Sequence, residues 1–392
     1  MKICFITYTV FNLGGIQRVL SRIASEFSKE HEVTILCASN LFKENRDTYN
    51  LDEKVRVEFG NDIFSLNFYE NIRKNIAKKA VLNIKGLNNI KYAKKICNIY
   101  YPKNILNKLT EYINRNNYDV VIAIDGIYGI PLSAIANRIK SKTVIWQHNS
   151  YDAYFNNKDR YYWNQDFLFK EYVPKVNKYV VLNDYDKRKY MEEKQLETLV
   201  IHNPRSFESI QKSDMKCKKF IAAGRFTYQK GFDLLIESFN KFCSLDQEWK
   251  LMIIGEGEEK KNIESLISKY GIEDRVEIHG FTDDIKSYFL QASILLLPSR
   301  WEGMPMIVLE SLEMGTPIIS YDITAINGLI SNNVEGIVVN KFNTDEFSDA
   351  MFELANSIDK RIDMSNSAIK KSNEFSIDNI NQKWKKMIND LF

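Results

Sequence analysis

Two glutamates are separated by seven residues in the stretch 299–320, "SRWEGMPMIVLESLEMGTPIIS". Glu302 precedes a Gly-Met-Pro turn, and Glu310 lies within the apolar segment that follows. Carboxylate oxygens accept hydrogen bonds, so such a pair can hold the hydroxyl groups of a ligand. They can equally be solvated carboxylates on a helix surface, and the spacing alone leaves both interpretations open.

The elements expected around these glutamates put them in different environments. A short apolar run ends at Pro298 and predicts a buried strand. A helix is expected to begin about Pro305, because proline is tolerated in the first helical turn. Glu302 then lies in the loop and Glu310 in the helix. The N–H groups from Met306 to Val308 should remain unpaired at the helix start, where the helix dipole favours an anion.

A basic pair follows the first strand expected after the middle of the chain, in "GRFTYQKGF". Arg225 ends that strand, and Lys230 stands five residues later, just before the next helix. An arginine fork and a compact ammonium suit the two phosphates of a diphosphate. The alternative is that both are solvated residues of a loop.

A Gly-Gly pair, Gly14 and Gly15, follows the first strand and opens the first helix. Glycine lets the backbone approach a ligand closely, and the helix start offers free N–H groups to an anion, although many such pairs are only tight turns. The dinucleotide fingerprint is absent, and the second strand ends in "CASN" with no acidic residue for a ribose. NAD binding is therefore disfavoured.

The order of elements predicts the domains. Short apolar runs, typical of parallel strands covered on both faces, alternate with amphipathic helical segments and restart after Asn203-Pro204. This predicts an α/β fold of two doubly wound domains, 1–204 and 205–375, with ligands at the carboxyl ends of the strands. The polar "RSFESIQKSDMK" after Pro204 is expected to be a hinge and linker. Residues 376–392 predict a C-terminal helix that docks on the first domain.

Composition excludes several classes of protein. The chain has 392 residues, of which 44% are hydrophobic and 27% charged, with a net charge of +3 that is too small to suggest nucleic acid as a partner. Its five cysteines form no Cys-x-x-Cys pair, which disfavours a disulfide framework or a zinc site. No window approaches the roughly 20 apolar residues of a membrane span, so a cytoplasmic protein is expected.

One region is strongly basic. The stretch 71–108 has ten Lys and Arg residues and no Asp or Glu, with apolar residues interleaved at mostly helical spacing. Such a basic amphipathic stretch predicts contact with an anionic membrane surface, and its alternative is a solvated helix face. The candidate membrane-contact residues are Lys74, Lys78, Lys79, Lys85, Lys94 and Lys95.

The combined pattern resembles the GT-B retaining glycosyltransferases of the large Glu-x7-Glu family, also called glycosyltransferase family 4 or glycosyl transferases group 1. The resemblance rests on Glu302 and Glu310 and on the Arg225/Lys230 pair in the order and domain expected for that family. The Gly-Gly turn and His148 in "WQHN", at the end of a first-domain strand, extend it over essentially the whole chain. The fold implied is GT-B, in which two Rossmann-like domains face a cleft and a C-terminal helix docks back.

The resemblance implies a role for each residue of the motifs. Arg225 and Lys230 would neutralise the diphosphate of a sugar nucleotide, Glu310 would bind the ribose, and Glu302 would face the donor sugar. His148 would lie near the transferred sugar and the acceptor, together with Gly14. The donor-binding residues implied besides these are Gly15, Gly255, Phe281, Gly303, Met304, Pro305, Met306, Ile307 and Val308.

The resemblance also implies the reaction. The protein would move a hexose or N-acetylhexosamine from a nucleotide-diphosphate sugar, most simply UDP-linked, to an oligosaccharide or lipid-linked acceptor at the inner face of the cell membrane, with retention. No cofactor or metal would be required, and no Asp-x-Asp motif is present. The family's Asp-x-Gly-Gly segment is replaced by "SYDITAINGLI", which leaves the sugar open. Two alternatives are a nucleotide-sugar epimerase of the same fold and a non-catalytic membrane-associated binding protein.

Overall fold

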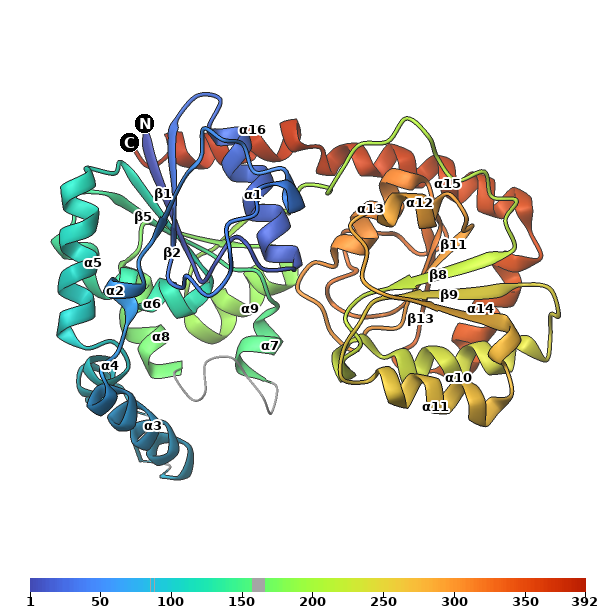
Figure 1. Ribbon diagram of the computed structural model, residues 1–392, viewed down its shortest axis with the longest axis horizontal. Helices are drawn as coiled ribbons and strands as arrows, with labels where there is room; N and C mark the ends of the chain where they lie inside the picture. The colour runs from blue at the N-terminus through green and yellow to red at the C-terminus, as the bar shows by residue number, and fades with distance from the viewer. Residues whose placement is uncertain (85, 88, 157–165) are drawn as a thin grey trace. The chain divides into compact units, whose positions relative to one another are not determined.

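The structure is a computed structural model that describes residues 1–392 except 85, 88 and 157–165 (Figure 1). It divides into two compact units, one of Met1–His202 with Ile380–Phe392 and the other of Asn203–Asn379. The sequence placed the first boundary after residue 204 and the second after residue 375. Each unit contains one parallel sheet, as the two series of apolar runs predicted.

In the described part of the first unit, seven parallel strands have the order β3-β2-β1-β4-β5-β6-β7. Their interior positions are apolar on both faces because helices cover both sides of the sheet. The strands are β1 (Lys2–Thr7), β2 (Glu32–Cys37), β3 (Arg56–Phe59), β4 (Val120–Ile124), β5 (Lys142–Trp146), β6 (Lys178–Val181) and β7 (Leu199–Val200). The helices are α1 (Gly15–Phe27), α2 (Asn61–Phe64), α3 (Phe68–Asn83), α4 (Ala93–Tyr100), α5 (Lys103–Asn116), α6 (Asp125–Ile135), α7 (Tyr151–Phe155), α8 (Asp166–Tyr172) and α9 (Asp184–Lys194).

The second unit, described throughout, has a six-stranded parallel sheet of order β10-β9-β8-β11-β12-β13. The strands are β8 (Lys219–Ala223), β9 (Lys250–Ile254), β10 (Val276–His279), β11 (Ile294–Leu297), β12 (Ile318–Tyr321) and β13 (Gly336–Val339). The helices are α10 (Phe232–Cys243), α11 (Lys260–Tyr270), α12 (Ile285–Phe289), α13 (Met306–Met314), α14 (Thr344–Ala355) and α15 (Ile358–Ser372). The order reverses between β8 and β11, and this is where a doubly wound sheet opens to a ligand.

The two edge strands of the first sheet were missed by the sequence reasoning. β3 has the sequence RVEF, with its first and last residues exposed, and β7 has only two residues. Each pairs with a neighbour on one side alone. Edge strands are short and carry charged residues, so they lack the continuous apolar run by which the central strands were recognised.

The segment after Pro204, expected to be a hinge and linker, is packed within the second unit. The Arg205 N–H donates to the carbonyl of Phe375 at 2.8 Å. The Ser209 N–H donates to the Glu313 carboxylate at 2.8 Å, and Lys212 Nζ lies 2.7 Å from the same group. The polar groups of this segment form buried hydrogen bonds to a carboxylate of α13. The sequence alone does not distinguish such polar residues from residues that are solvated.

The C-terminal helix, α16 (Ile377–Asn389), lies almost entirely within the first unit. Trp384 is fully buried and makes edge contacts with the rings of Phe27 and Trp146, at centroid distances of 6.1 and 4.8 Å. Lys385 pairs with Glu30 at the surface. Burying one tryptophan in this way dominates the docking energy of a short helix.

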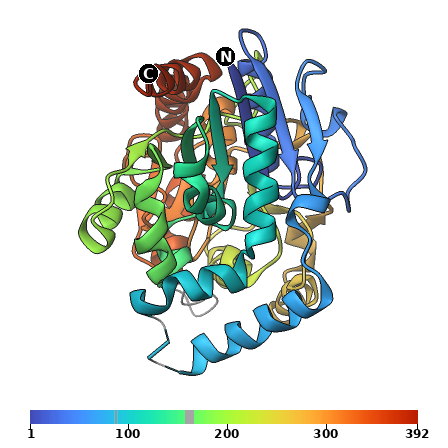
Figure 2. The same cartoon turned by 90° about the vertical axis from the view of Figure 1, so that its left-hand side faces the viewer.

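The basic stretch 71–108 is divided among α3, α4 and the start of α5. α3 begins at a capping box, in which the Asn67 side chain accepts from the Glu70 N–H and Glu70 reaches back to the Asn67 N–H. Figure 2 shows α3 at the lower edge of the first unit, beside α4. Lys85, one of the predicted membrane-contact residues, lies outside the described residues.

Candidate active site

The carboxyl edge of the second sheet joins the two motifs that the sequence singled out. Lys230 ends the loop after β8, and Glu302 lies in the loop between β11 and α13. Lys230 Nζ lies 2.5 Å from Glu302 Oε1, and Ser299 Oγ donates to the same oxygen at 2.7 Å. Glu302 is buried, so its charge is held by an ammonium and a hydroxyl instead of water.

The backbones of these two loops touch, which fixes the pair. Gly231 adopts φ +66°, and a Cβ atom there would lie 2.2 Å from the carbonyl oxygen of Pro298. Only glycine permits both this conformation and this approach. Arg300 adds a bidentate ion pair with Asp233 at 2.8 and 2.6 Å, which ties the second loop to the first turn of α10.

Arg225 differs from Lys230 in its surroundings. Its side chain is exposed, and in this fully described unit no ion pair to it is found, while the next residue, Phe226, is fully buried. The buried ring of Phe226 anchors the loop after β8, and Arg225 faces solvent in the same loop as Lys230. An exposed, unpaired guanidinium at a sheet edge is available to a phosphate group.

The start of α13 corrects one expectation. The Val308 N–H is not free, because it donates to the carbonyl of Pro305 at 3.0 Å. Met304, Ile307 and Val308 have buried side chains, so a ligand can meet only main-chain atoms at these positions. The helix begins at Met306, one residue after the predicted start, with Pro305 as its cap in an extended conformation.

Two more residues at this helix start have internal partners. The backbone N–H of Asn203 donates to the sulfur of Met304 at 3.1 Å, and the Asn203 side-chain amide approaches the sulfur of Met306 at 3.8 Å. Gly303 also has a partner within the protein. The donor-binding role predicted for this segment stays a prediction.

Glu310 lies inside α13 and is 3% exposed. Ser206 Oγ donates to Glu310 Oε1 at 2.6 Å. Glu310 is therefore a buried carboxylate with a hydroxyl partner, which excludes the alternative of a solvated carboxylate on the helix surface. A ligand hydroxyl could join or replace Ser206 at the same oxygen atoms.

A third carboxylate of α13, Glu313, was missed by the sequence reasoning. It is 3% exposed and pairs with Arg205 Nη1 at 2.6 Å and Lys212 Nζ at 2.7 Å. It holds the segment 205–213 onto the second unit and is structural. Glu310 and Glu313 are three residues apart, so they lie on one helix face, a signal that the sequence did contain.

Gly255 and Phe281 follow the two strands on the other side of β8. Gly255 has φ +150°, and a Cβ atom there would lie 1.9 Å from the carbonyl oxygen of Gly224, so close packing of β9 on β8 already explains this glycine. Phe281 is 45% exposed after β10. An exposed aromatic ring at a strand end is compatible with stacking on a base, and both roles stay predictions.

His148 lies in the first unit, two residues after β5, and so in a different unit from the residues above. Its ring packs on Trp146 at a centroid distance of 4.3 Å, and burial lowers the pKa of His148 to about 3. Nε2 is buried and has no hydrogen-bond partner among the described residues. The imidazole is therefore neutral at physiological pH and carries an unsatisfied nitrogen.

Asp125 positions His148 and was also missed. It follows β4 with φ +58°, unusual for a residue other than glycine, and its Oδ1 accepts from the His148 backbone N–H at 2.9 Å and from the Tyr154 hydroxyl. Burial raises the pKa of Asp125. Strained backbone at a strand end is often functional, and the signal available was an acid directly after the apolar run "VVIAI".

Gly14 and Gly15 lie between β1 and α1, at the same sheet edge as His148. The Gly14 N–H donates to the Tyr49 hydroxyl at 2.9 Å, and Gly15 is the first residue of α1. The first turn of α1 contains no acidic residue, so nothing offsets the positive end of the helix dipole.

The described residues form neither a metal-binding cluster nor a membrane-spanning helix. They contain no group of three or more His, Cys, Asp or Glu side chains arranged to hold a metal ion. None of their helices combines the length and the apolarity that crossing a bilayer requires. On α3 and α4, Lys79, Lys94 and Lys95 are exposed, whereas Lys74 and Lys78 are partly buried, and burial lowers the pKa of both.

Comparisons with known proteins show which proteins this chain resembles. Residues 205–371 match the family model of glycosyl transferases group 1. A chain of Haemophilus influenzae named an uncharacterized glycosyltransferase is 24% identical over 98% of this chain and 99% of its own length. A Campylobacter jejuni protein, named GalNAc-alpha-(1->4)-GalNAc-alpha-(1->3)-diNAcBac-PP-undecaprenol alpha-1,4-N-acetyl-D-galactosaminyltransferase, is 24% identical over 100% of this chain and 99% of its own.

Among solved structures, HepE of Anabaena in complex with UDP-glucose superposes with a TM-score of 0.74 at 15% identity, covering 100% of both chains. At that identity the likeness concerns the fold. The matched segment contains Arg225, Lys230, Glu302 and Glu310. The family match is therefore confined to the second domain, residues 205–371, and the fold of the whole chain is GT-B.

Proposed function

We propose that this protein is a retaining glycosyltransferase that moves a hexose or N-acetylhexosamine from a UDP-sugar to a lipid-linked sugar acceptor. The observation that carries the proposal is the ion pair of Lys230 and Glu302, formed where two loops meet at the carboxyl edge of the second sheet, with Arg225 exposed and unpaired in the first of these loops. Two cations and a buried carboxylate match a diphosphate joined to a sugar.

The two cations would act on the leaving group. A lysine ammonium has three donors, so Lys230 can keep its contact with Glu302 while it donates to a phosphate oxygen. Arg225 can hold a second phosphate in bidentate fashion. Charge that develops on the diphosphate as the glycosidic bond breaks is then met by groups that are already in place, which makes a divalent metal unnecessary in this proposal.

The two glutamates would hold the two sugars of the donor. Glu310 offers the ribose hydroxyls an acceptor that now binds Ser206. Glu302 is oriented by Lys230 and Ser299, so its carboxylate can accept hydrogen bonds from the hydroxyls of the transferred sugar. His148, neutral and with Nε2 unsatisfied, is suited to donate or accept one hydrogen bond from a sugar hydroxyl in the first domain.

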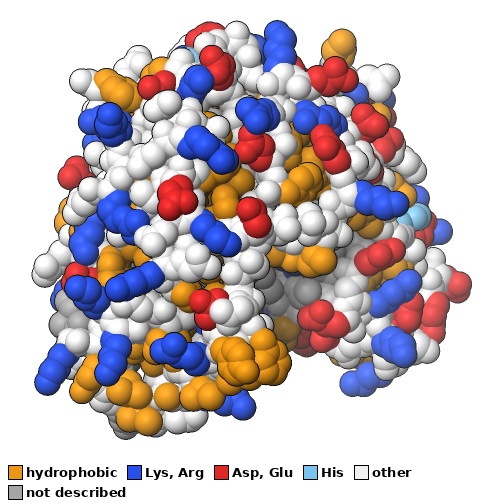
Figure 3. All heavy atoms as spheres, turned by 60° about the vertical axis from the view of Figure 1, so that its left-hand side comes forward, with side chains coloured by type: hydrophobic (Ala, Val, Ile, Leu, Met, Phe, Trp, Pro, Cys, Tyr) orange, Lys and Arg blue, Asp and Glu red, His pale blue; other side chains and the backbone are white. Residues whose placement is uncertain are grey.

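The acceptor is proposed from the exposed apolar and basic side chains of α3 and from the Campylobacter relative, whose printed name gives an undecaprenol-linked glycan. α3 exposes Phe68, Tyr69 and Ile76 by 74, 77 and 62%, and basic side chains stand among them. Figure 3 shows hydrophobic side chains with Lys and Arg along the lower edge of the first unit. Such a helix would associate peripherally with the cytoplasmic leaflet.

The experiment that tests this function has two parts. The purified protein is screened by thermal unfolding with UDP, GDP, ADP and their sugars, and stabilisation of about 2.7 kcal/mol is expected at 100 times Kd for the correct nucleotide. Product analysis by NMR with and without a lipid-linked acceptor then follows the anomeric configuration. An inverted product, or conversion of the donor without acceptor, would overturn the proposal.

A further inference from the structure

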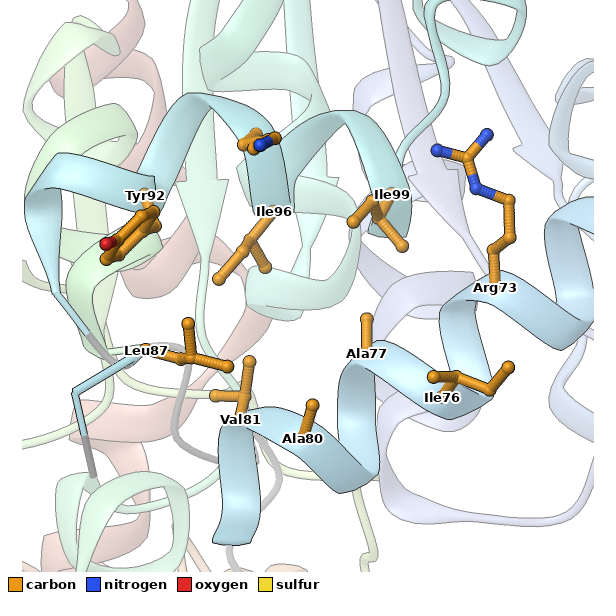
Figure 4. A pocket seen from close by; sticks show the side chains of 10 residues that line it. Arg73, Ile76, Ala77, Ala80, Val81, Leu87, Tyr92, Ile96 and Ile99 are labelled. Atoms are coloured by element: carbon orange, nitrogen blue, oxygen red, sulfur yellow. The ribbon is translucent and has the colours of Figure 1, made fainter. Parts of the chain in front are cut away.

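An apolar groove separates α3 from α4. It has a volume of about 380 Å³ and is lined by Arg73, Ile76, Ala77, Ala80, Val81, Leu87, Tyr92, Lys95, Ile96 and Ile99. In Figure 4, Ala77 and Val81 of α3 point toward Ile96 and Ile99 of α4. The two alanines leave open space where larger side chains would close the helix pair, and Lys95 and Arg73 are the only charged residues among those named.

The groove has two different ends. Leu87 and Tyr92 stand at one end, and Arg73 stands at the other, beyond Ile99 (Figure 4). α4 has eight residues, so the groove is about 12 Å long, too short for a partner helix of several turns but long enough for part of a hydrocarbon chain.

A second cavity lies near the Arg73 end of the groove and shares no lining residue with it. It has a volume of about 270 Å³, and its lining includes Lys74 and Tyr100, the sequence neighbours of Arg73 and Ile99. Its walls also include the rings of Tyr8, Phe64, Tyr101 and Tyr128, so it adjoins the carboxyl ends of β1 and β4. Aromatic faces at the carboxyl edge of a parallel sheet suit a sugar ring.

Two polar groups of this second cavity lack partners. The Tyr100 hydroxyl is buried and has no hydrogen-bond partner among the described residues, and burial raises the pKa of Tyr100 to about 12, so it remains a donor. No acidic partner is found for Lys74 in the described part of the chain, and its pKa is lowered by burial and then by Lys78. An unpaired hydroxyl and an unpaired ammonium in one cavity can both donate hydrogen bonds to a bound anion.

We propose that the two cavities together bind a lipid-linked sugar phosphate, with the hydrocarbon chain between α3 and α4, the phosphate at Arg73, Lys74 and Tyr100, and the sugar among the tyrosines. The inference rests on the proposed function, because it places the acceptor of that reaction. Charge complementarity supports it, since the stretch 71–108 contains ten basic residues and no acidic one. Exposed Phe68 and Tyr69 on the same helix would let the chain enter from a bilayer.

The test measures binding of farnesyl phosphate, below its micellar concentration, to the intact protein by calorimetry, with farnesol and inorganic phosphate as comparison probes. The wild type should bind farnesyl phosphate at least about tenfold more tightly than either probe, because one charge-assisted contact is worth about that factor. Ala77→Trp and, independently, Ala80→Trp should fill the groove and lower the affinity for farnesyl phosphate about tenfold or more. Lys74→Gln should weaken the binding of farnesyl phosphate about tenfold and leave the binding of farnesol unchanged.

Lys187→Gln is the matched control, because Lys187 is an exposed helical lysine of α9 that lines neither cavity and lies outside the basic stretch 71–108. It should change the affinity by less than about twofold, as expected of a solvated charge. Equal losses in Lys74→Gln and Lys187→Gln, or unchanged affinity in both folded tryptophan variants, would overturn the inference. The thermal shift with UDP is recorded for every variant. If wild type shifts with UDP yet ignores farnesyl phosphate, the lipid site is wrong while the donor site stands.

Discussion

Lys230 and Glu302 form an ion pair of 2.5 Å between residues that are 72 positions apart in the chain. One comes from the loop after β8 and the other from the loop after β11, and these two strands are neighbours in the sheet. The pair is largely buried, with exposed side-chain fractions of 18 and 8%. It therefore links the stability of the second domain to the chemistry proposed for it.

Removing either cation should slow turnover strongly. Arg225→Ala and Lys230→Ala are each expected to lower kcat by about a hundredfold or more, because losing one preorganised donor to a developing charge costs about 2.7–4 kcal/mol. Initial rates at saturating donor measure this. Lys261→Ala, which removes an exposed lysine of α11, is the matched control and should leave kcat unchanged. Near-wild-type turnover in both site variants would refute the diphosphate assignment.

The same two substitutions should differ in stability. Lys230→Ala leaves the buried Glu302 carboxylate without its ammonium and should lower the free energy of unfolding by about 3 kcal/mol. Arg225→Ala changes an exposed, unpaired side chain and should stay within about 0.5 kcal/mol of wild type. Urea unfolding measures both. Glu302→Gln added to Lys230→Ala should recover part of the loss, with a coupling of about 0.5–3 kcal/mol, and strict additivity would show that the pair does not interact.

Substitutions of the two buried glutamates of α13 should have different effects, one on donor binding and the other on stability. Glu310→Gln is expected to raise the KM for the nucleotide sugar about tenfold or more, because a charged acceptor for the ribose is lost, with a small change in unfolding. Glu313→Gln should instead lower the free energy of unfolding by about 3 kcal/mol, because Arg205 and Lys212 lose their shared carboxylate, and leave the KM of the folded enzyme unchanged. The reverse pattern would exchange the two roles.

His148 should make the protein less stable in acid. Its pKa is about 3 in the folded state and about 6.5 when unfolded, so between these values the unfolded chain binds the extra proton. Stability is then full above pH 6.5 and falls on acidification by about 1.4 kcal/mol per pH unit. Urea unfolding at pH 7 and pH 5 should show a loss of about 2 kcal/mol in wild type that is absent from His148→Gln. Equal losses in the two proteins would show that His148 titrates normally when folded.

The elements around the site were largely predictable because their signals are local. Central strands such as β5 and β11 are continuous apolar runs. Pro305 and Gly315 mark the ends of α13 in the sequence, and the helix begins within one residue of the predicted start. The packing at the boundary between the two domains was harder to predict from the sequence. Residues 205–213 have the composition of a linker, and only the structure shows that they are packed within the second domain by hydrogen bonds to Glu313.

The sequence by itself determined two parallel α/β domains, a resemblance to GT-B glycosyltransferases and the residue types of a diphosphate site. These follow from the periodicity of burial and from motifs of a few residues, which are local properties of the chain. The tertiary structure decided which charges meet. Lys230 reaches Glu302 because β8 and β11 are adjacent and Gly231 lets their loops touch, Glu310 meets Ser206 instead of water, and Asp125 holds the backbone of His148. Contacts between residues far apart in the chain depend on strand order and on side-chain packing, and neither is written in any short stretch of sequence.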